Sequence, residues 1–243
     1  QKSEEGLEAR LIHQVGGTVT VKSSDDGLNA KDWTLESSEG QGPGQQTKTV
    51  KAEAANVKNL DQAGEVKIVI DGGTLTVDAE GDGLDANGSI EINGGTVVVN
   101  GPTSGANAAL DYDDNGKLNG GTVLFVDNGE MTMGFGSDSS QAFLMASVQG
   151  TAGTTVEVVD SSGKTVASLK ASKAFSTVLI SSPEIKEGEK YTIKVGSNST
   201  TATASKQAAN IGGGPGQGGP GGGQPGQGGP GGQPGQGGRP GGR

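Results

Sequence analysis

Short acidic segments recur beside glycines along the chain, and they hold the side chains best suited to chemistry. The candidates are Glu8, Asp25, Asp26, Asn29, Glu80, Asp82, Asp85, Asp111 and Asp113. Carboxylates that are brought together without neutralisation repel one another, and their pKa values rise. A hard divalent cation with six to eight oxygen ligands relieves this repulsion, and Ca2+ tolerates irregular sites better than Mg2+. The sequence therefore predicts calcium ligands at these positions.

Three interpretations of the acidic segments stay open. The carboxylates form a solvated face without metal, they bind calcium purely for stability, or they bind calcium that also contacts an acidic ligand. Residues 111–116 (DYDDNG) match the first half of an EF-hand calcium loop. The twelfth position of that loop is Thr122, where an EF-hand has glutamate, so a true EF-hand is not expected.

Catalytic signals are poor. His13 is the only histidine, and it lies in an alternating segment that is expected to be a strand, with no nucleophile suggested beside it. Paired carboxylates can hydrolyse glycosides, but acids this numerous make that signal unspecific. The chain is therefore expected to be non-catalytic.

The acidic segments belong to a repeat that must position them. Gly-Gly-Thr begins at Gly16, Gly72, Gly94 and Gly120, and Gly72 and Gly94 are 22 residues apart. A period of this size is typical of stacked-repeat proteins, and one repeat has room for three short strands and three tight turns. Apolar residues alternate with polar ones at Val19 and Val21, Ile68 and Ile70, Ile90 and Ile92, and Val97 and Val99.

We predict from this pattern an all-β fold. Residues 1–136 are expected to form a right-handed parallel β-helix whose repeats bury their apolar faces against one another. The alternative is an antiparallel sandwich with Asn-Gly hairpins. An excursion loop is expected at 31–65, an antiparallel β capping module at 137–196, and a linker with a Gly/Pro/Gln-rich tail at 197–243. In the tail, glycine recurs at every third position from Gly223, which favours either a polyproline-II or collagen-like association or a flexible segment.

Composition limits the possible partners. Hydrophobic residues make up 30% and aromatic residues 3% of the 243 residues, and cysteine is absent. The net charge of −10 argues against nucleic acid or an anionic membrane as partner unless a cation intervenes. No apolar run is long enough to span a bilayer. Because the first residues already lie inside a repeat, we interpret the chain as the C-terminal portion of a longer precursor.

Several segments resemble a family of bacterial extracellular carbohydrate-binding domain-containing proteins. They are residues 23–30 (SSDDGLNA), 81–89 (GDGLDANGS), 99–103 (VNGPT), 109–112 (ALDY), 180–183 (ISSP) and 188–191 (GEKY). The resemblance covers roughly residues 4–196. It implies a calcium-binding, pectate-lyase-like parallel β-helix, with binding of cellulose and polygalacturonate.

The expected function is therefore calcium-dependent binding of an acidic or cellulosic polysaccharide at the cell surface, outside the cell. Trp33 and Tyr112 are the candidate glycan-contacting aromatic residues. The alternative is a structural subunit of an extracellular filament or surface assembly. In that case the open edge at residues 6–21 pairs with another copy or with a missing N-terminal part, and the tail mediates contacts.

Overall fold

The computed structural model describes residues 3–32 and 65–207, and within these residues every regular element is a β-strand. Trp33, most of the predicted excursion and the Gly-rich tail lie outside the described residues. The strands form four sheets. The predicted all-β class is confirmed. No helix among the described residues is long or apolar enough to cross a membrane.

Three parallel sheets are built from residues 7–127. The first contains β1 (Leu7–Ala9), β4 (Leu28–Ala30), β7 (Leu84–Ala86) and β10 (Leu110–Tyr112). The second contains β2 (Leu11–Gln14), β5 (Lys67–Ile70), β8 (Ser89–Ile92) and β11 (Asn115–Leu118). The third contains β3 (Thr18–Lys22), β6 (Thr74–Asp78), β9 (Thr96–Asn100) and β12 (Thr122–Asp127).

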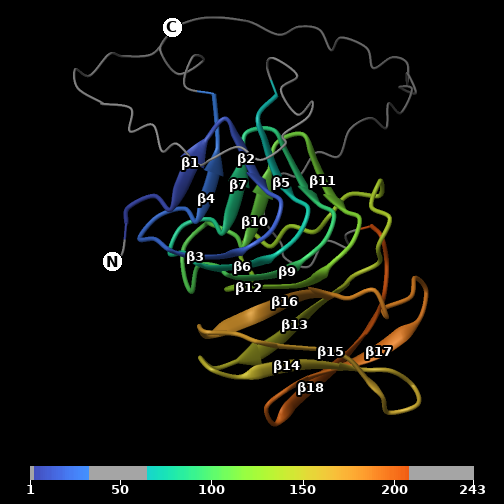
Figure 1. Cartoon of the computed structure of the whole chain (residues 1–243). Helices are drawn as coiled ribbons and strands as arrows, with labels where there is room; N and C mark the ends of the chain where they lie inside the picture. Colours follow the sequence, from blue (N-terminus) through green and yellow to red (C-terminus); the bar gives the residue numbers. More distant parts are fainter. Residues whose placement is uncertain (1–2, 33–64, 208–243) are drawn as a thin grey trace, which may run out of the picture.

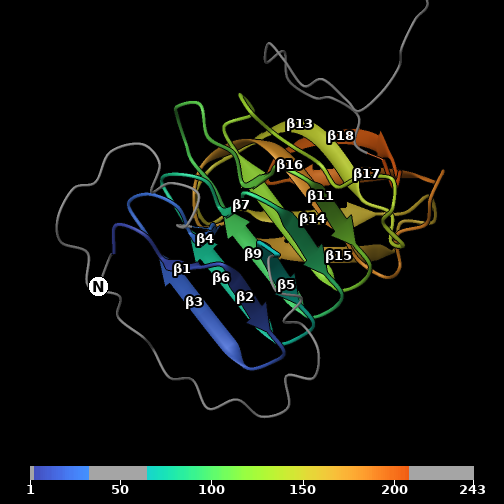
Figure 2. The ribbon, with the colours of Figure 1, turned by 90° about the horizontal axis from the view of Figure 1, so that it is seen from above.

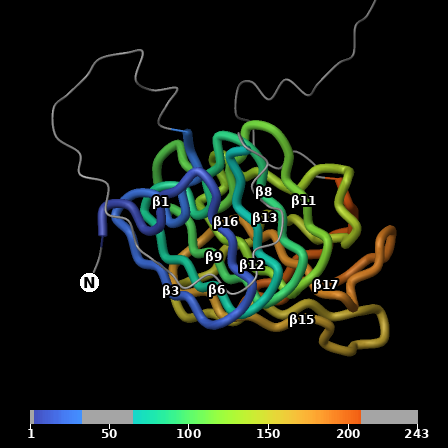
Figure 3. Tube along the Cα trace, turned by 45° about the horizontal axis from the view of Figure 1, so that its top comes forward, coloured from blue at the N-terminus to red at the C-terminus, as the bar shows by residue number. Residues whose placement is uncertain are grey.

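The chain enters the three sheets in rotation, so β1–β3, β4–β6, β7–β9 and β10–β12 form repeats 1 to 4 (Figures 1 and 3). Each strand pairs in parallel with the equivalent strand of the next repeat. In the first sheet, for example, Leu7, Leu28, Leu84 and Leu110 lie in one register. This parallel pairing is not the pairing of Asn-Gly hairpins, so the sandwich alternative is wrong for these strands.

The Gly-Gly pairs form the corners between the second and third sheets. The second glycine of each pair has a positive φ, 76° at Gly17, 81° at Gly73, 84° at Gly95 and 90° at Gly121. A Cβ atom on Gly73 would lie 2.4 Å from the carbonyl oxygen of Gly17. Glycine is therefore required both by backbone conformation and by the close stacking of one corner on the next.

Apolar side chains from all three sheets fill the space between them. Ile68, Ile90, Val97 and Leu84 are fully buried in this cluster. At the repeat 4 end, the ring of Phe135 packs edge-to-face against both Phe125 and Phe143, with ring centroids 5.8 Å apart in each pair. These rings close that end of the core.

Antiparallel strands follow the repeats. Two of them, β16 (Phe175–Ser181) and β13 (Leu144–Gly150), extend the third sheet beyond β12. The fourth sheet contains β15 (Thr165–Lys170), β14 (Thr155–Val159), β17 (Lys190–Val195) and β18 (Asn198–Thr203). It packs on the third sheet through a second apolar cluster (Figure 1).

The predicted boundary at residue 197 differs from the structure. The segment that was expected to be a linker contains β18, which pairs with β17 from Lys190–Thr203 to Val195–Asn198. Its sequence, NSTTAT, lacks the alternation of apolar and polar residues that marks the repeats, because all six side chains are exposed or half-buried at the sheet edge. The hydrophobic pattern therefore did not reveal this strand.

Candidate acidic cation site

Two columns of side chains run along the first sheet, with one residue from each repeat. The strand column consists of Glu8, Asn29, Asp85 and Asp111, which share one register. The corner column consists of Glu5, Asp26, Asp82 and Ala108, each three positions earlier in the chain. The amides of Gly6, Gly27 and Gly83 bond the carbonyls of Asp26, Asp82 and Ala108, which stacks the corners.

Two carboxylates of the corner column link repeat 2 to repeat 3 and repeat 3 to repeat 4. Oδ1 of Asp26 accepts a 2.8 Å hydrogen bond from the backbone nitrogen of Asp82, and Oδ1 of Asp82 accepts one of 2.5 Å from the nitrogen of Ala108. Burial nevertheless raises the pKa of Asp82 to about 6, with Asp111 and Asp26 adding to the rise. The backbone donors therefore only partly stabilise the charged form.

Asn29 is the most buried polar member of the columns, with an exposed fraction of 5%. Its side-chain nitrogen donates a 3.0 Å hydrogen bond to Oδ2 of Asp26. Its side-chain oxygen, Oδ1, is buried and has no hydrogen-bond partner among the residues that the structure describes. A buried acceptor without a donor is costly, and this one stands in the strand column next to Asp85.

Asp85 has acidic neighbours in both columns. Burial, followed by the charges of Asp26, Asp82, Asp111 and Asp113, raises its pKa to about 7. Burial also raises the pKa of Asp111, with Asp113 contributing. Neighbouring carboxylates contribute to both shifts after burial, so negative charge is concentrated around Asp85 and Asp111.

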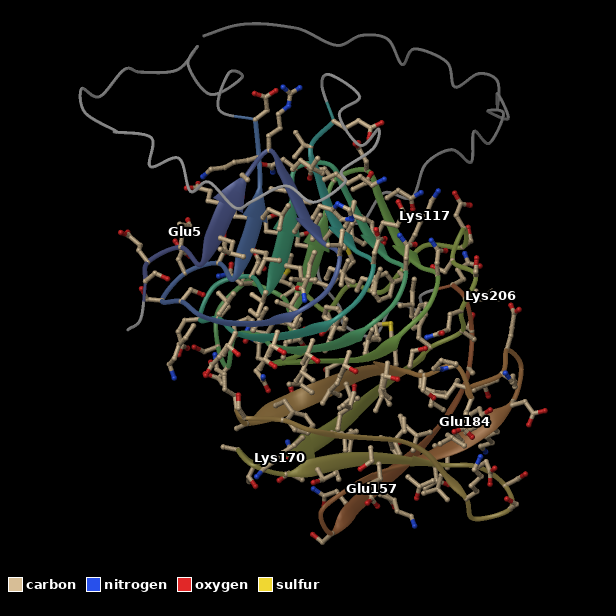
Figure 4. The ribbon with its side chains drawn as sticks, in the orientation of Figure 1. Glu5, Lys117, Glu157, Lys170, Glu184 and Lys206 are labelled. Carbon is tan, nitrogen blue, oxygen red and sulfur yellow. The ribbon has the colours of Figure 1, made fainter. Side chains whose placement is uncertain are left out.

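Glu5 is a member of this site that the sequence reasoning did not identify. Burial, followed by the charges of Asp26, Asp25 and Glu8, raises its pKa to about 7. Its Oε2 atom is buried and has no hydrogen-bond partner within residues 3–32 and 65–207. Figure 4 shows Glu5 at the outer edge of repeat 1. The signal was present in the sequence, because EGLE at 5–8 aligns with DGLN at 26–29 and DGLD at 82–85.

The remaining predicted ligands have different surroundings. Glu8 forms a 2.6 Å ion pair with Lys31, and Glu80 lies 3.4 Å from the side-chain nitrogen of Lys173. Asp113 accepts a 3.4 Å hydrogen bond from Asn87. The structure thus places Glu80 beside a lysine of the C-terminal strands, whereas Asp113 stays within electrostatic reach of Asp85 and Asp111.

Asp25 and Asp26 both lie against the backbone of Gly81. A Cβ atom at that position would be 2.6 Å from Oδ1 of Asp25 and 2.5 Å from Oδ1 of Asp26. The glycine therefore makes room for two adjacent carboxylates at the corner between repeats 1 and 2.

The donor chemistry fits a hard cation, because it consists of carboxylates and one unpartnered amide oxygen. These oxygen atoms, however, are arranged in columns along the sheet and do not converge on one point. Among residues 3–32 and 65–207, no three acidic or histidine side chains converge as a ready-made metal cage. A cation would have to draw neighbouring side chains of the columns toward it.

Tyr112, the described glycan-contacting candidate, is held in the wall of repeat 4. Its hydroxyl donates a 2.7 Å hydrogen bond to the carbonyl oxygen of Gly134. A Cβ atom on Gly116 would lie 2.3 Å from its ring, so the ring covers that glycine. The aromatic ring thus has a structural role, and its predicted contact with a glycan stays a prediction.

His13 is engaged on the second sheet, and its Nε2 atom lies 2.7 Å from Oδ2 of Asp71. Asn93 donates a 2.8 Å hydrogen bond to the other oxygen of that carboxylate, and Asn119 donates one of 2.8 Å to Asn93. The histidine therefore stands at one end of a polar ladder across the repeats. This ladder is separate from the acidic columns.

Comparison of this chain with protein-family models, curated proteins and solved structures gives no match.

Proposed function

We propose that this chain is a non-catalytic, calcium-binding protein of the cell surface that binds acidic polysaccharide through the two acidic columns. The observation that carries the proposal is the buried, unpartnered Oδ1 atom of Asn29 inside a run of carboxylates. An amide oxygen among carboxylates is a typical calcium ligand set. The proposal also rests on the resemblance of the acidic segments to extracellular carbohydrate-binding proteins.

The residues that would hold calcium are those that the two columns bring together. They are Asp26, Asn29, Asp82, Asp85 and Asp111, with Asp25, Asp113 and Glu5 at the margin. Bound calcium would supply the positive charge that a uronate carboxylate requires. Four strands at a spacing of about 4.8 Å give the columns a length of about 14 Å, which suits a polymer better than a single small ligand.

The proposed architecture around this site is a right-handed parallel β-helix. It is supported by the rotation of the strands through three sheets and by parallel pairing at every step from repeat 1 to repeat 4. Crossover connections between parallel strands of one sheet are almost always right-handed. Such a scaffold keeps the column residues at fixed spacing without help from a loop.

Calcium dependence follows from charge. The chain carries a net charge of −10, so it repels an acidic polysaccharide unless a cation lies between them. Catalysis is not part of the proposal, because the only histidine is paired with Asp71 on another sheet. Appearance of unsaturated uronate products from polygalacturonate would contradict this point.

The test is retention on insoluble polygalacturonate with calcium or with a chelator. The wild-type chain and the Glu157→Gln variant, which removes one charge from the fourth sheet, should be retained only with calcium. Asp85→Asn and Asn29→Leu should lose retention. Binding that a chelator does not change, or that Asp85→Asn leaves intact, contradicts the proposal. Cellulose, tested in parallel, shows whether a neutral polymer is also bound.

Assembly into an extracellular structure is a second candidate function, favoured by a separate observation. The core position of repeat 1 is open, since Leu7 is 43% exposed. In a filament of copies stacked end to end, repeat 1 of one copy would have to pair with repeat 4 of the next. The edge of repeat 4 is already occupied in the third sheet, where β16 pairs antiparallel with β12. The exposed end of repeat 1 is therefore the surface to consider.

A further inference from the structure

The C-terminal strands form a groove of their own. It lies where β13 ends, where β16 begins and where β17 turns into β18, and Figure 2 shows β13 beside β18. Two adjoining pockets of about 340 and 370 Å³ make up this groove, and they share Gln149 and Ser176. We call the two pockets together the amide groove. Pockets of this size are typical of sites for small ligands.

The amide groove is lined by uncharged polar side chains. None of the described residues that line it carries a charge. Amides come from Asn128, Gln149 and Asn198, and hydroxyls come from Ser147, Ser176 and Thr177. Each of these groups can both donate and accept hydrogen bonds. An acidic or basic ligand would leave its charge unpaired here, so the lining favours a neutral ligand.

Thr177 supplies the observation that points most directly to a ligand. It is 3% exposed, and it lies in register between Asp127 of β12 and Ser147 of β13. It lines the groove, and its hydroxyl forms no hydrogen bond with any described residue. Gly129, with a φ of 83°, leaves space beside that hydroxyl, because a Cβ atom on Gly129 would lie 2.5 Å from Oγ1 of Thr177. A nearly buried hydroxyl without a partner gains most from a ligand that supplies one.

An irregularity in β13 presents a second binding group. The register of β13 against β16 shifts between Ser147 and Gly150, and Gln149 lies in this shifted segment. Bulges of this kind redirect side chains and are frequent beside active sites. The backbone carbonyl of Gln149 accepts a 2.9 Å hydrogen bond from the side-chain nitrogen of Asn198, which joins the β17–β18 turn to β13. The side chain of Gln149 is exposed and forms no hydrogen bond with a described residue, so its amide is free to bind a ligand.

An aromatic ring forms the apolar part of the groove. Phe175 is 6% exposed, and its ring lies so close to Gly150 that a Cβ atom on this glycine would clash with it. Val195, which is 1% exposed, packs beside the same position. An apolar patch therefore adjoins the amides and hydroxyls. A sugar ring combines the matching features, because its C–H face is apolar and its hydroxyls donate and accept hydrogen bonds.

We propose that the amide groove binds a neutral oligosaccharide directly, without calcium. The amides of Gln149 and Asn198 and the hydroxyl of Thr177 bind sugar hydroxyls, and Phe175 contacts the apolar face of one ring. The acidic columns lie on the first sheet, whereas this groove lies on the C-terminal strands. The two sites therefore differ in location, in ligand charge and in calcium dependence.

Two-dimensional NMR of the full chain in chelator tests the proposal, with cellohexaose, xylohexaose, mannohexaose and maltohexaose as neutral probes. At least one sugar should shift the side-chain amides of Gln149 and Asn198 and leave that of Asn29 unchanged. Trigalacturonate, an acidic probe, should shift none of the three. If no neutral sugar shifts Gln149 and Asn198, or if trigalacturonate shifts them equally, the proposal is overturned. Asp85→Asn should bind the sugar as the wild type does, so the result is independent of the calcium proposal.

Substitutions in the groove test the named contacts. Thr177→Val removes the hydroxyl at nearly the same shape, and Gln149→Leu removes an exposed amide without disturbing the core. Each should weaken binding of the responding sugar about two- to tenfold. Thr165→Val is the control, because Thr165 is exposed on β15 and lies outside the groove. Unchanged affinity in both groove variants, with both folded by circular dichroism, also overturns the proposal.

Discussion

The backbone nitrogen of Asp82 donates a 2.8 Å hydrogen bond to Oδ1 of Asp26, across the boundary between repeat 2 and repeat 3. The other oxygen of the same carboxylate accepts the side-chain amide of Asn29. Asp26 therefore joins two repeats and also orients the side chain of Asn29, whose oxygen has no hydrogen-bond partner among the described residues. Variants at this position should be made with asparagine, because alanine removes the hydrogen-bond acceptor together with the charge.

Calcium should stabilise the folded chain. Extracellular calcium sites with affinities of about 10⁻⁴–10⁻³ M contribute roughly 0.5–1.5 kcal/mol each at millimolar calcium. For a chain of this size, each kcal/mol raises the melting temperature by about 2–4 °C. Thermal unfolding followed by circular dichroism, with and without chelator, measures the effect. An unchanged melting temperature would mean that the columns hold no calcium under these conditions.

Acidification should change the free energy of unfolding in opposite directions with and without calcium. The pKa values of Asp82, Asp85 and Glu5 are raised to about 6, 7 and 7 from ordinary values of 3.8, 3.8 and 4.5. The folded state thus binds these protons more tightly than the unfolded state, and their ionisation destabilises the fold. Without calcium, the free energy of unfolding should rise as pH falls from 7 toward 4.

With saturating calcium, protons compete with the cation, so the same acidification should lower the free energy of unfolding. Urea unfolding at several pH values, in calcium and in chelator, gives both slopes. Asp71 does not interfere in this range. Its pKa is lowered below 3.8, where burial is outweighed by hydrogen bonds from Asn93 and His13, so its stabilising effect is lost only at more acidic pH. Equal slopes in the two conditions would count against a shared site for protons and calcium.

The stacked glycine corners permit a matched pair of substitutions. Gly17→Ala and Gly73→Ala impose the same strain, because φ is 76° and 81°. A Cβ atom at position 73 would also clash with a carbonyl oxygen 2.4 Å away. A Cβ atom at position 17 would have no atom within 4 Å. We expect a loss of about 1–2 kcal/mol for Gly17→Ala and about 3 kcal/mol or more for Gly73→Ala. Equal losses in urea unfolding would show that the corners are not closely stacked.

Lys173 should anchor the C-terminal strands to repeat 2. Its side-chain nitrogen donates a 2.6 Å hydrogen bond to the carbonyl oxygen of Ala79 and lies 3.5 Å from Asp78 and 3.4 Å from Glu80. Lys173→Met retains most of the apolar stem but removes the charge, so we expect a loss of about 1.5–3 kcal/mol. The exposed Lys170→Met should be close to neutral. If the Lys173→Met variant is as stable as the wild type, Lys173 does not anchor the C-terminal strands.

Periodicity in the sequence predicted most of the repeats. The alternation at Ile90 and Ile92 and the Gly-Gly pairs gave the parallel strands and their corners, because backbone conformation at a corner is dictated locally by glycine. The C-terminal strands were harder to delimit. The prediction of a separate capping module did not foresee that β13 and β16 extend the third sheet, because strand partners far apart in sequence leave no local pattern.

The candidate site was predicted in part. Asp26, Asp82 and Asp85 stand out by their spacing, and the structure brings them within electrostatic reach of one another. Residue type alone did not separate Glu80, which lies beside Lys173, from the acids of the columns. The buried state of the Asn29 oxygen could not be read from the sequence either, because it depends on the register of β4 against β7.

A calcium titration followed by two-dimensional NMR of backbone and side-chain amides tests the central claim most directly. We expect the side-chain amide of Asn29 and the backbone amides of Asp82 and Asp85 to shift together, with half-saturation at about 10⁻⁴–10⁻³ M calcium. Ile193, buried in the fourth sheet, should not shift, and Asp85→Asn should weaken the response at least about tenfold. If these three residues do not respond to calcium, or respond no more than Ile193, the acidic columns are not a calcium site.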